Sequence, residues 1–189
     1  MRVHRLLTVR AAIVYTFAVA VSFGIVAVPS SAPPAEAASY ACYGMGYPSR
    51  SFNVKYDNLN STYTGYFNTT RSRWNSSGAG VSISLNASAA SAVTAASYKD
   101  SWYGYYSYTW VLKVTKVQIK VNTRTLQAGA PSGQYLNWFY STAVHEFGHA
   151  LKLHDNPNTT SNSIMTYSRN RSTITTPQTY DVNNVKACY

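Results

Sequence analysis

The sequence predicts an α+β fold in which a sheet of the α/β type packs against long helices. Apolar residues alternate with polar ones in several short stretches, as they do in strands that bury one face. In two longer stretches, around residues 59–74 and 134–152, apolar residues recur every three or four positions, as in amphipathic helices. No internal repeat or linker divides the chain after residue 37, so we expect one domain there.

The first half of the chain begins with a strand at 52–56, where Phe, Val and Tyr alternate with polar residues. The helix at 59–74 follows, although its Thr, Asn and Gly residues favour a helix only weakly. The segment 78–80 ends that helix with two glycines, and a second strand alternates apolar residues over 81–85. Residues 87–96 are rich in Ala and Ser, and their pattern favours neither a helix nor a strand.

The second half is aromatic and β-branched between 98 and 121. Its apolar residues change from even to odd positions, so we expect a bulge or a turn near residues 115–116. Residues 122–133 are a predicted loop, because Pro and Gly punctuate them. A helix is expected from about 134 to 152, and a last short helix from Pro177, since proline suits the first helical position.

The first 37 residues have the three-part pattern of a secretory signal peptide. Three arginines precede the uncharged apolar run 11–28, and Ala35-Glu36-Ala37 offers small residues at the two positions that a signal peptidase reads. A membrane anchor is the alternative, because the run is just long enough to span a bilayer. We expect cleavage after Ala37, which leaves residues 38–189 as a secreted, extracellular domain with no stable membrane insertion.

Positive charge dominates the chain that remains. It has 13 Lys and Arg residues against 5 Asp and Glu residues, a net charge of +8. Such a charge favours anionic partners such as acidic polymers or lipid head groups, but a solvated basic surface that aids solubility is the simpler interpretation. No basic-aromatic motif for nucleic acid is present, so we expect no nucleic-acid partner. We also expect the protein to be a monomer.

Two cysteines, Cys42 and Cys188, stand at the two ends of this domain. An even count in an exported protein predicts a disulfide between them. Closing so long a loop stabilises a fold by about 4–5 kcal/mol in the chain-entropy model. The alternative is that Cys42 binds a metal ion and keeps the protein latent, which would leave Cys188 unpaired.

Metal-binding residue types gather in one segment. After signal cleavage the chain keeps one glutamate and three histidines, and all four lie within ten residues: His145, Glu146, His149 and His154. On a helix that turns about 100° per residue, His145 and His149 lie about 40° apart, so one ion can meet both imidazoles. The apolar residues Leu136, Tyr140, Ala143, Val144, Phe147 and Leu151 cluster on the opposite side. The alternative is a helix whose histidines only form hydrogen bonds.

Two imidazoles and one further ligand suit a catalytic zinc ion, which keeps a fourth position open for water. Zinc lowers the pKa of that water to about 7 and polarises a substrate carbonyl. Glu146 follows the first ligand, where it can take the proton from the water and pass it to the leaving amine. The pattern therefore predicts zinc-dependent hydrolysis of peptide bonds with Glu146 as the general base.

The segment from His145 to Asp155 resembles the extended zinc motif of metzincin peptidases, and is most similar to the bacterial matrixin-like and snapalysin-like groups. In that motif the third ligand stands six residues after the second histidine, a position that Asp155 occupies here. Snapalysin-like members carry Asp there, whereas matrixin-like members carry His. Residues 163–167 resemble the Met-turn of the family, and residues 176–182 resemble the start of its closing helix.

Lys152 departs from the family, which has Gly where the chain leaves the helix in a left-handed conformation. On an unbroken helix His154 and Asp155 would both point away from His145, and Pro157 opposes such a continuation. A third ligand therefore requires a bend before His154. The spacing favours Asp155 as that ligand, and His154 is the alternative because histidine is the commoner ligand type.

The resemblance also implies roles for two residues near the zinc. Met165 would lie beneath the ion and support the histidines without binding it, and the simpler interpretation is a core methionine. Tyr167 would act in catalysis by stabilising the oxyanion, as a tyrosine does in astacin-like metzincins, and the simpler interpretation is one more surface tyrosine. The sequence does not decide whether calcium also binds.

For the whole domain, the resemblance implies a metzincin-like zincin fold with a twisted, mostly parallel sheet and two long helices above the cleft. It implies a secreted zinc metalloendopeptidase whose protein or peptide substrate binds along an edge strand. One alternative is a secreted polymer- or cell-wall-binding protein on a degenerate peptidase scaffold with a structural zinc, although such a site does not need Glu146. Another is a peptidase that acts on peptidoglycan cross-links.

Overall fold

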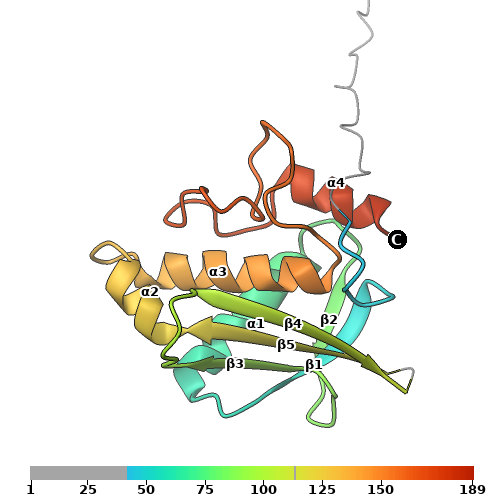
Figure 1. Ribbon diagram of the computed structural model, residues 1–189, viewed down its shortest axis with the longest axis horizontal. Helices are drawn as coiled ribbons and strands as arrows, with labels where there is room; N and C mark the ends of the chain where they lie inside the picture. Colours follow the sequence, from blue (N-terminus) through green and yellow to red (C-terminus); the bar gives the residue numbers. More distant parts are fainter. Residues whose placement is uncertain (1–41, 113) are drawn as a thin grey trace, which may run out of the picture. The chain divides into compact units, whose positions relative to one another are not determined.

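A five-stranded sheet forms the centre of the computed structural model, which describes residues 42–112 and 114–189 (Figure 1). The order of its strands is β2-β1-β3-β5-β4. The strands are β1 (Ser51–Tyr56), β2 (Ser82–Leu85), β3 (Ala92–Ala96), β4 (Gly104–Val111) and β5 (Val114–Asn122). The first four strands in that order pair in parallel, and β4 joins β5 as an antiparallel edge strand. The sheet is therefore mixed.

Two long helices, α1 (Ser61–Asn75) and α3 (Tyr135–Ala150), pack against each other and against the sheet (Figure 1). Their contact is aromatic, since the ring centroids of Phe67 and Phe139 lie 5.3 Å apart. The Trp74 indole also donates a 2.9 Å hydrogen bond to the carbonyl of Val144. The short helices α2 (Thr123–Gly129) and α4 (Thr179–Ala187) complete the α+β arrangement.

The structure confirms the strands expected at 52–56 and 81–85 and the helices expected at 59–74 and 134–152, each within a few residues. It corrects the expected loop at 122–133, where α2 begins as soon as Asn122 caps it by accepting from the Arg124 amide. It also shows that the ambiguous segment contains β3, which is paired on both sides. Alanine and serine have little preference for strands, so this segment carries no strand signal of its own. Pairing with the neighbouring strands stabilises β3 instead.

Two further boundaries differ from expectation. The turn between β4 and β5 lies at Leu112, where φ is 51°, and not near residues 115–116. The last helix begins at Thr179 rather than Pro177, because Gln178 and Asp181 form a capping box at its start.

The predicted disulfide is present, and it joins Cys42 to Cys188 with their Cα atoms 5.6 Å apart. The segment that follows Cys42 runs along the end of α3. The Tyr47 amide donates to the carbonyl of Ala150 at 2.9 Å, and Cys42 forms a β-bridge with Leu153. The described part of the chain has no helix long and apolar enough to cross a bilayer. The expected signal peptide, residues 1–37, lies outside the described residues.

Candidate metal centre

Helix α3 carries His145, Glu146 and His149 on its last two turns, and all three side chains are buried. The opposite side of these turns packs into the core through Ala143, Val144, Phe147 and Leu151, as the helical angles predicted. Leu136 is the exception, because it lies near the start of the helix and is exposed. The buried apolar side fixes the rotation of the helix and so directs the two imidazoles to one point.

The helix ends in a bend at Lys152, whose φ is 67°. This left-handed residue turns the chain as glycine commonly does, and the Leu153 amide then donates back to the carbonyl of Gly148 at 2.9 Å. The Lys152 ammonium lies 4.1 Å from the ring centroid of Tyr189. Gly46 lies directly against Lys152, where any side chain would overlap it. The bend that a third ligand requires is therefore present.

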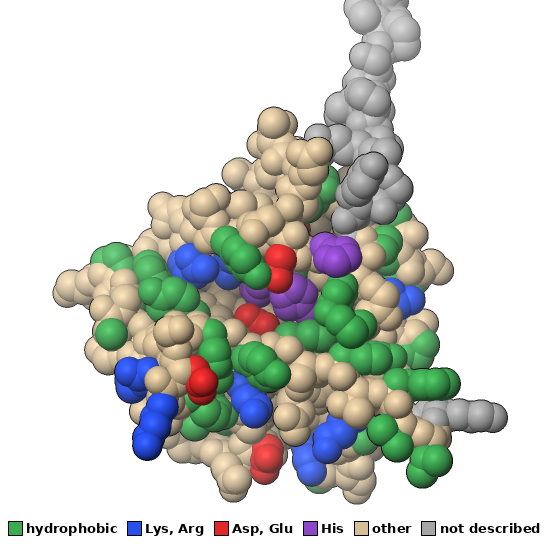
Figure 2. Space-filling view, viewed as in Figure 1, with side chains coloured by type: hydrophobic (Ala, Val, Ile, Leu, Met, Phe, Trp, Pro, Cys, Tyr) green, Lys and Arg blue, Asp and Glu red, His purple; other side chains and the backbone are tan. Residues whose placement is uncertain are grey.

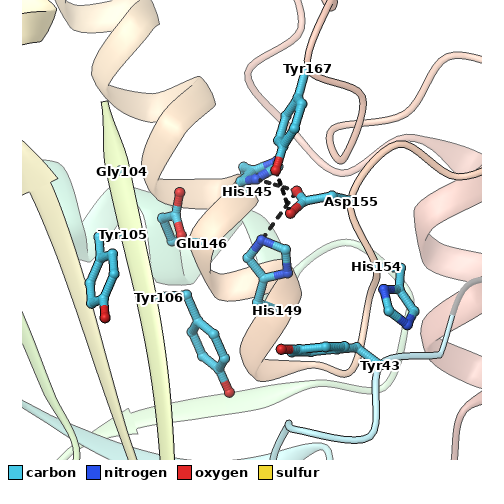
Figure 3. A pocket seen from close by; sticks show the side chains of 10 residues that line it. All are labelled: Tyr43, Gly104, Tyr105, Tyr106, His145, Glu146, His149, His154, Asp155 and Tyr167. Atoms are coloured by element: carbon cyan, nitrogen blue, oxygen red, sulfur yellow. Dashed lines mark hydrogen bonds and ion pairs between the residues drawn. The ribbon is translucent and has the colours of Figure 1, made fainter. Parts of the chain in front are cut away.

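Beyond the bend, Asp155 returns to the two histidines (Figure 3). Its Oδ1 atom lies 3.0 Å from Nε2 of His145 and 3.3 Å from Nε2 of His149. His154 turns away, is exposed, and meets the ring of Tyr43 edge to face at 4.8 Å. The structure thus brings together His145, His149 and Asp155, and it does not bring His154 to them.

Backbone carbonyls orient both imidazoles from behind. Nδ1 of His145 lies 3.0 Å from the carbonyl oxygen of Ile164, and Nδ1 of His149 lies 2.9 Å from that of Leu153. A carbonyl only accepts, so each Nδ1 carries the proton and donates it. Each Nε2 of a neutral ring then presents a lone pair toward Asp155.

The three converging atoms fit a bound cation. Oδ1 of Asp155 is buried and has no hydrogen-bond partner in the part of the chain that the structure describes. Tetrahedral zinc with bonds of about 2.0–2.2 Å separates its ligand atoms by roughly 3.3 Å, close to the 3.0 and 3.3 Å seen here. Two nitrogen donors and one oxygen donor are a ligand set that zinc accepts.

The pKa values of the site residues also fit a bound cation. Burial lowers the pKa of His145 to about 4, which keeps that ring neutral and available as a ligand. Burial also opposes protonation of His149, but the carboxylates of Asp155 and Glu146 outweigh it and raise the pKa of that ring. Burial alone would raise the pKa of Asp155, but the two histidine rings beside it and the hydrogen bond from Tyr167 hold that pKa well below the usual range. The site therefore favours a positive charge where the three side chains meet.

Glu146 lies beside this point, on the side of β4 (Figure 3). Its carboxylate packs against Gly104, the first residue of that strand, where a side chain would overlap it. Burial raises the pKa of Glu146 to about 7. A carboxylate with that pKa can accept and release a proton near neutral pH.

Tyr167 and Asn156 hold the ligand loop. The Tyr167 hydroxyl donates to Oδ2 of Asp155 at 2.6 Å, which leaves Oδ1 for the histidines. The Asn156 amide side chain accepts from the backbone of Tyr167 at 2.7 Å, and its own backbone amide donates to the carbonyl of Met165. More than half of the Tyr167 side chain is exposed, so its hydroxyl borders both the ligand and the open cavity.

Met165 is fully buried against α3. Gly148 lies between His145 and His149 in the sequence, and the Met165 sulfur occupies the space that a side chain at Gly148 would need. Met165 is therefore a core residue packed against the helix that carries the histidines, and a role in supporting the imidazoles stays a prediction.

A buried carboxylate that the sequence interpretation missed holds the segment 163–167, which contains Met165. Asp181 accepts hydrogen bonds from the Ser163 hydroxyl at 2.5 Å and from the backbone amides of Ile164 and Gln178 at 2.8 Å. Ile164 is the residue whose carbonyl orients His145. Asp181 therefore acts on the site through one backbone segment. The capping pattern at the last helix was the only signal in the sequence.

Arg169 was also missed. It is buried, and its guanidinium donates to the hydroxyl and carbonyl of Ser141 at 2.9 and 3.2 Å and to the carbonyl of Thr166 at 2.9 Å. These bonds tie α3 to the segment 163–167, which includes Thr166. Burial lowers its pKa to about 9, so it remains a cation near Glu146 and Asp155. Nothing in the local sequence distinguishes this arginine.

The side chains surround an open cavity of about 280 Å³. Its walls are the ligand loop, the segment after Cys42, and the start of β4 from Gly104 to Tyr106. Figure 2 shows histidine and acidic side chains within this hollow. The start of β4 therefore forms one wall of the cavity beside the three converging atoms.

Comparisons with known proteins give a structural match. No family model and no curated protein matches the chain. A chain from the solved structure of the GM1-bound form of the ECX AB5 holotoxin is similar, with a TM-score of 0.54 and 14% sequence identity. The match covers 79% of this chain and 86% of that chain. At this identity the likeness concerns the fold.

This match corrects the fold class. The chain has a mixed sheet with helices, which is α+β as expected at that level, but the fold it is similar to is that of the holotoxin chain and not the expected metzincin-like zincin fold. The sequence motifs behind that expectation lie between residues 145 and 182. Motifs of this length shape a site and do not determine the sheet around it.

Proposed function

We propose that this protein is a zinc-dependent endopeptidase. One observation carries the proposal: two Nε2 lone pairs and the Oδ1 of Asp155 converge beside the buried carboxylate of Glu146. A site that only held a structural ion would not need a further buried carboxylate beside its three ligands. The motif resemblance to metzincin peptidases supports the same reaction.

His145, His149 and Asp155 would hold the zinc. When bound, the ion lowers the pKa of a water molecule and polarises the substrate carbonyl. The backbone carbonyls behind the imidazoles and the Tyr167 hydroxyl behind Asp155 keep all three ligands in place, so little reorganisation is needed.

Glu146 would move the protons of the reaction. Its carboxylate accepts the proton of the attacking water and then donates it to the nitrogen of the leaving amine. Burial keeps this group dry and raises its pKa to about 7, so both protonation states are accessible at neutral pH. Tyr167 borders the same cavity, and its part in stabilising the oxyanion remains a prediction.

Strand β4 supports an extended peptide as the substrate. It is an edge strand, because its only partner in the sheet of the described residues is β5. Unpaired backbone groups along an edge can form hydrogen bonds with a peptide added as a further strand. The strand starts at Gly104, beside Glu146, so a bound peptide would pass the catalytic carboxylate. The open cavity suits internal peptide bonds.

Export fits the structure at a coarse level, because a disulfide is typical of an oxidising compartment. We propose that the chain is secreted and acts outside the cell as a monomer on protein or peptide substrates.

The test compares cleavage of denatured casein by the wild type and by Glu146→Gln, with zinc content measured for both. We expect equal zinc in both proteins and a loss of about 10²–10⁴-fold in rate for the variant. A chelator should abolish wild-type activity, and Asp57→Asn, an exposed acidic residue elsewhere, should leave it unchanged. Equal rates for wild type and Glu146→Gln would overturn the proposal.

A further inference from the structure

The tip of the β4–β5 hairpin exposes three consecutive apolar side chains. Trp110 is 64% exposed, Val111 56% and Leu112 92%. Most other large apolar residues of the described chain lie in the core. Figure 2 shows hydrophobic side chains around this tip, which Figure 1 places at the far end of the hairpin.

The sheet itself does not need this tip. Strand β3 joins β5 only from the pair Ala92 and Gln118 onward. The rungs nearest the turn, from Thr109–Lys116 to Val111–Val114, therefore pair only within the hairpin. Trp110 and Val111 on these rungs bury little surface, so their side chains add little to the stability of the fold.

The chemistry of the turn is also unusual for a hairpin in water. Leu112 has a φ of 51°, a conformation that hairpin turns usually give to Asn, Asp or Gly. A leucine there is both strained and almost fully exposed. Neither packing nor turn geometry explains a leucine at this position, whereas contact with a partner would.

The charge of the hairpin indicates the partner. No acidic residue occurs between Gly104 and Asn122, whereas Lys116 and Lys120 lie on β5. Lys116 stands opposite Thr109, one rung from Trp110. Lys120 lies at the other end of the hairpin, opposite Tyr105, so Lys116 is the lysine nearest the tip among the described residues. An apolar tip with a lysine behind it and no acidic residue on the hairpin is complementary to a bilayer with anionic head groups, which attract cations near the surface.

We propose that the hairpin tip docks on the surface of an anionic lipid bilayer. Leu112 and Val111 enter the boundary of the acyl chains, Trp110 lies at the level of the head groups, and Lys116 contacts the anionic groups. A projecting tip fits a deformable lipid surface. The docking is peripheral, in keeping with the absence of a membrane-spanning helix among the described residues.

This docking would also fix the distance between the lipid surface and the candidate metal centre. Strand β4 runs from Gly104 beside Glu146 to Val111 at the tip, and seven steps of about 3.4 Å make roughly 24 Å. The cavity would lie about that far along the strand from the lipid surface. The inference does not depend on the proposed peptidase activity.

The test uses protein exported into the medium and vesicles of phosphatidylglycerol or of phosphatidylcholine. In sedimentation at low salt we expect binding to the anionic vesicles, much weaker binding to the zwitterionic ones, and a blue shift of tryptophan emission on binding. Trp110→Ser with Leu112→Ser should weaken binding by at least about tenfold. Leu85→Ser with Leu136→Ser, both exposed elsewhere, is the matched control and should bind as the wild type does.

Two further variants separate insertion from adsorption. Trp110→Phe should keep the binding and lose the blue shift, because Trp74, Trp102 and Trp138 lie outside the hairpin. Lys116→Glu should weaken binding to the anionic vesicles alone. Thermal melting checks that each variant is folded. If the wild type does not bind phosphatidylglycerol vesicles, or the tip variant binds them as tightly as the control, the proposal is wrong.

Discussion

The Tyr167 hydroxyl donates a 2.6 Å hydrogen bond to Oδ2 of Asp155, the carboxylate whose Oδ1 faces both histidines. Because a hydrogen bond behind a ligand fixes its orientation, we expect Tyr167→Phe to weaken zinc affinity by about 10–100-fold. Titration with a competing chelator measures this. If catalysis falls in Tyr167→Phe that is saturated with zinc, the tyrosine also acts on the substrate. Unchanged affinity would show that Asp155 holds its position alone.

Asp181 should matter for both folding and the site. Asp181→Ala removes the acceptor of three donors, two of them backbone amides. Unsatisfied buried donors cost about 1–3 kcal/mol each, so we expect a loss of about 3 kcal/mol or more in the free energy of unfolding. Urea denaturation measures it, with the exposed Asp100→Ala as control. A loss below about 1 kcal/mol would contradict the role assigned to this carboxylate.

Lys152 offers a test of the bend. A left-handed residue other than glycine costs about 1–2 kcal/mol, but glycine loses more chain entropy on folding and cannot contact Tyr189. We therefore expect Lys152→Gly to change stability by less than about 1 kcal/mol. The β-branched Lys152→Ile should destabilise by more than that, whereas Lys186→Ile on α4 should not. Equal melting of the two isoleucine variants would show that the bend is not strained.

The disulfide closes a loop with a sequence separation of 146 residues. The variant with Cys42→Ser and Cys188→Ser should lose about 4–5 kcal/mol of stability in the chain-entropy model. Denaturation of both proteins under non-reducing conditions measures the difference. If the two unfold at the same denaturant concentration, the segment after Cys42 is held by its contacts with the end of α3 alone.

Much of the site was predictable because its chemistry is local. His145, Glu146 and His149 share two helical turns, so their arrangement follows from helical geometry. The position of Asp155 followed from its spacing, once Pro157 excluded a continued helix. The bend at Lys152 was required by that argument, and the structure has it at this residue.

The missed features depend on contacts between distant segments. Asp181 contacts Ser163 and Ile164 across 18 and 17 residues, and Arg169 contacts Ser141 across 28. No local pattern indicates which polar residue will be buried. Strand β3 consists of small residues whose strand conformation comes from its neighbours. The predicted metzincin-like fold was wrong for a related reason, because a motif of a few helical turns does not determine the sheet around it.

The most direct test of the account is the zinc content of the purified protein and of its ligand variants, measured by mass spectrometry after dialysis. We expect one zinc per chain in the wild type and in His154→Ala, and a loss of zinc in His145→Ala, His149→Ala and Asp155→Ala. A wild type without zinc, or a protein that loses zinc in His154→Ala and keeps it in Asp155→Ala, would contradict the account.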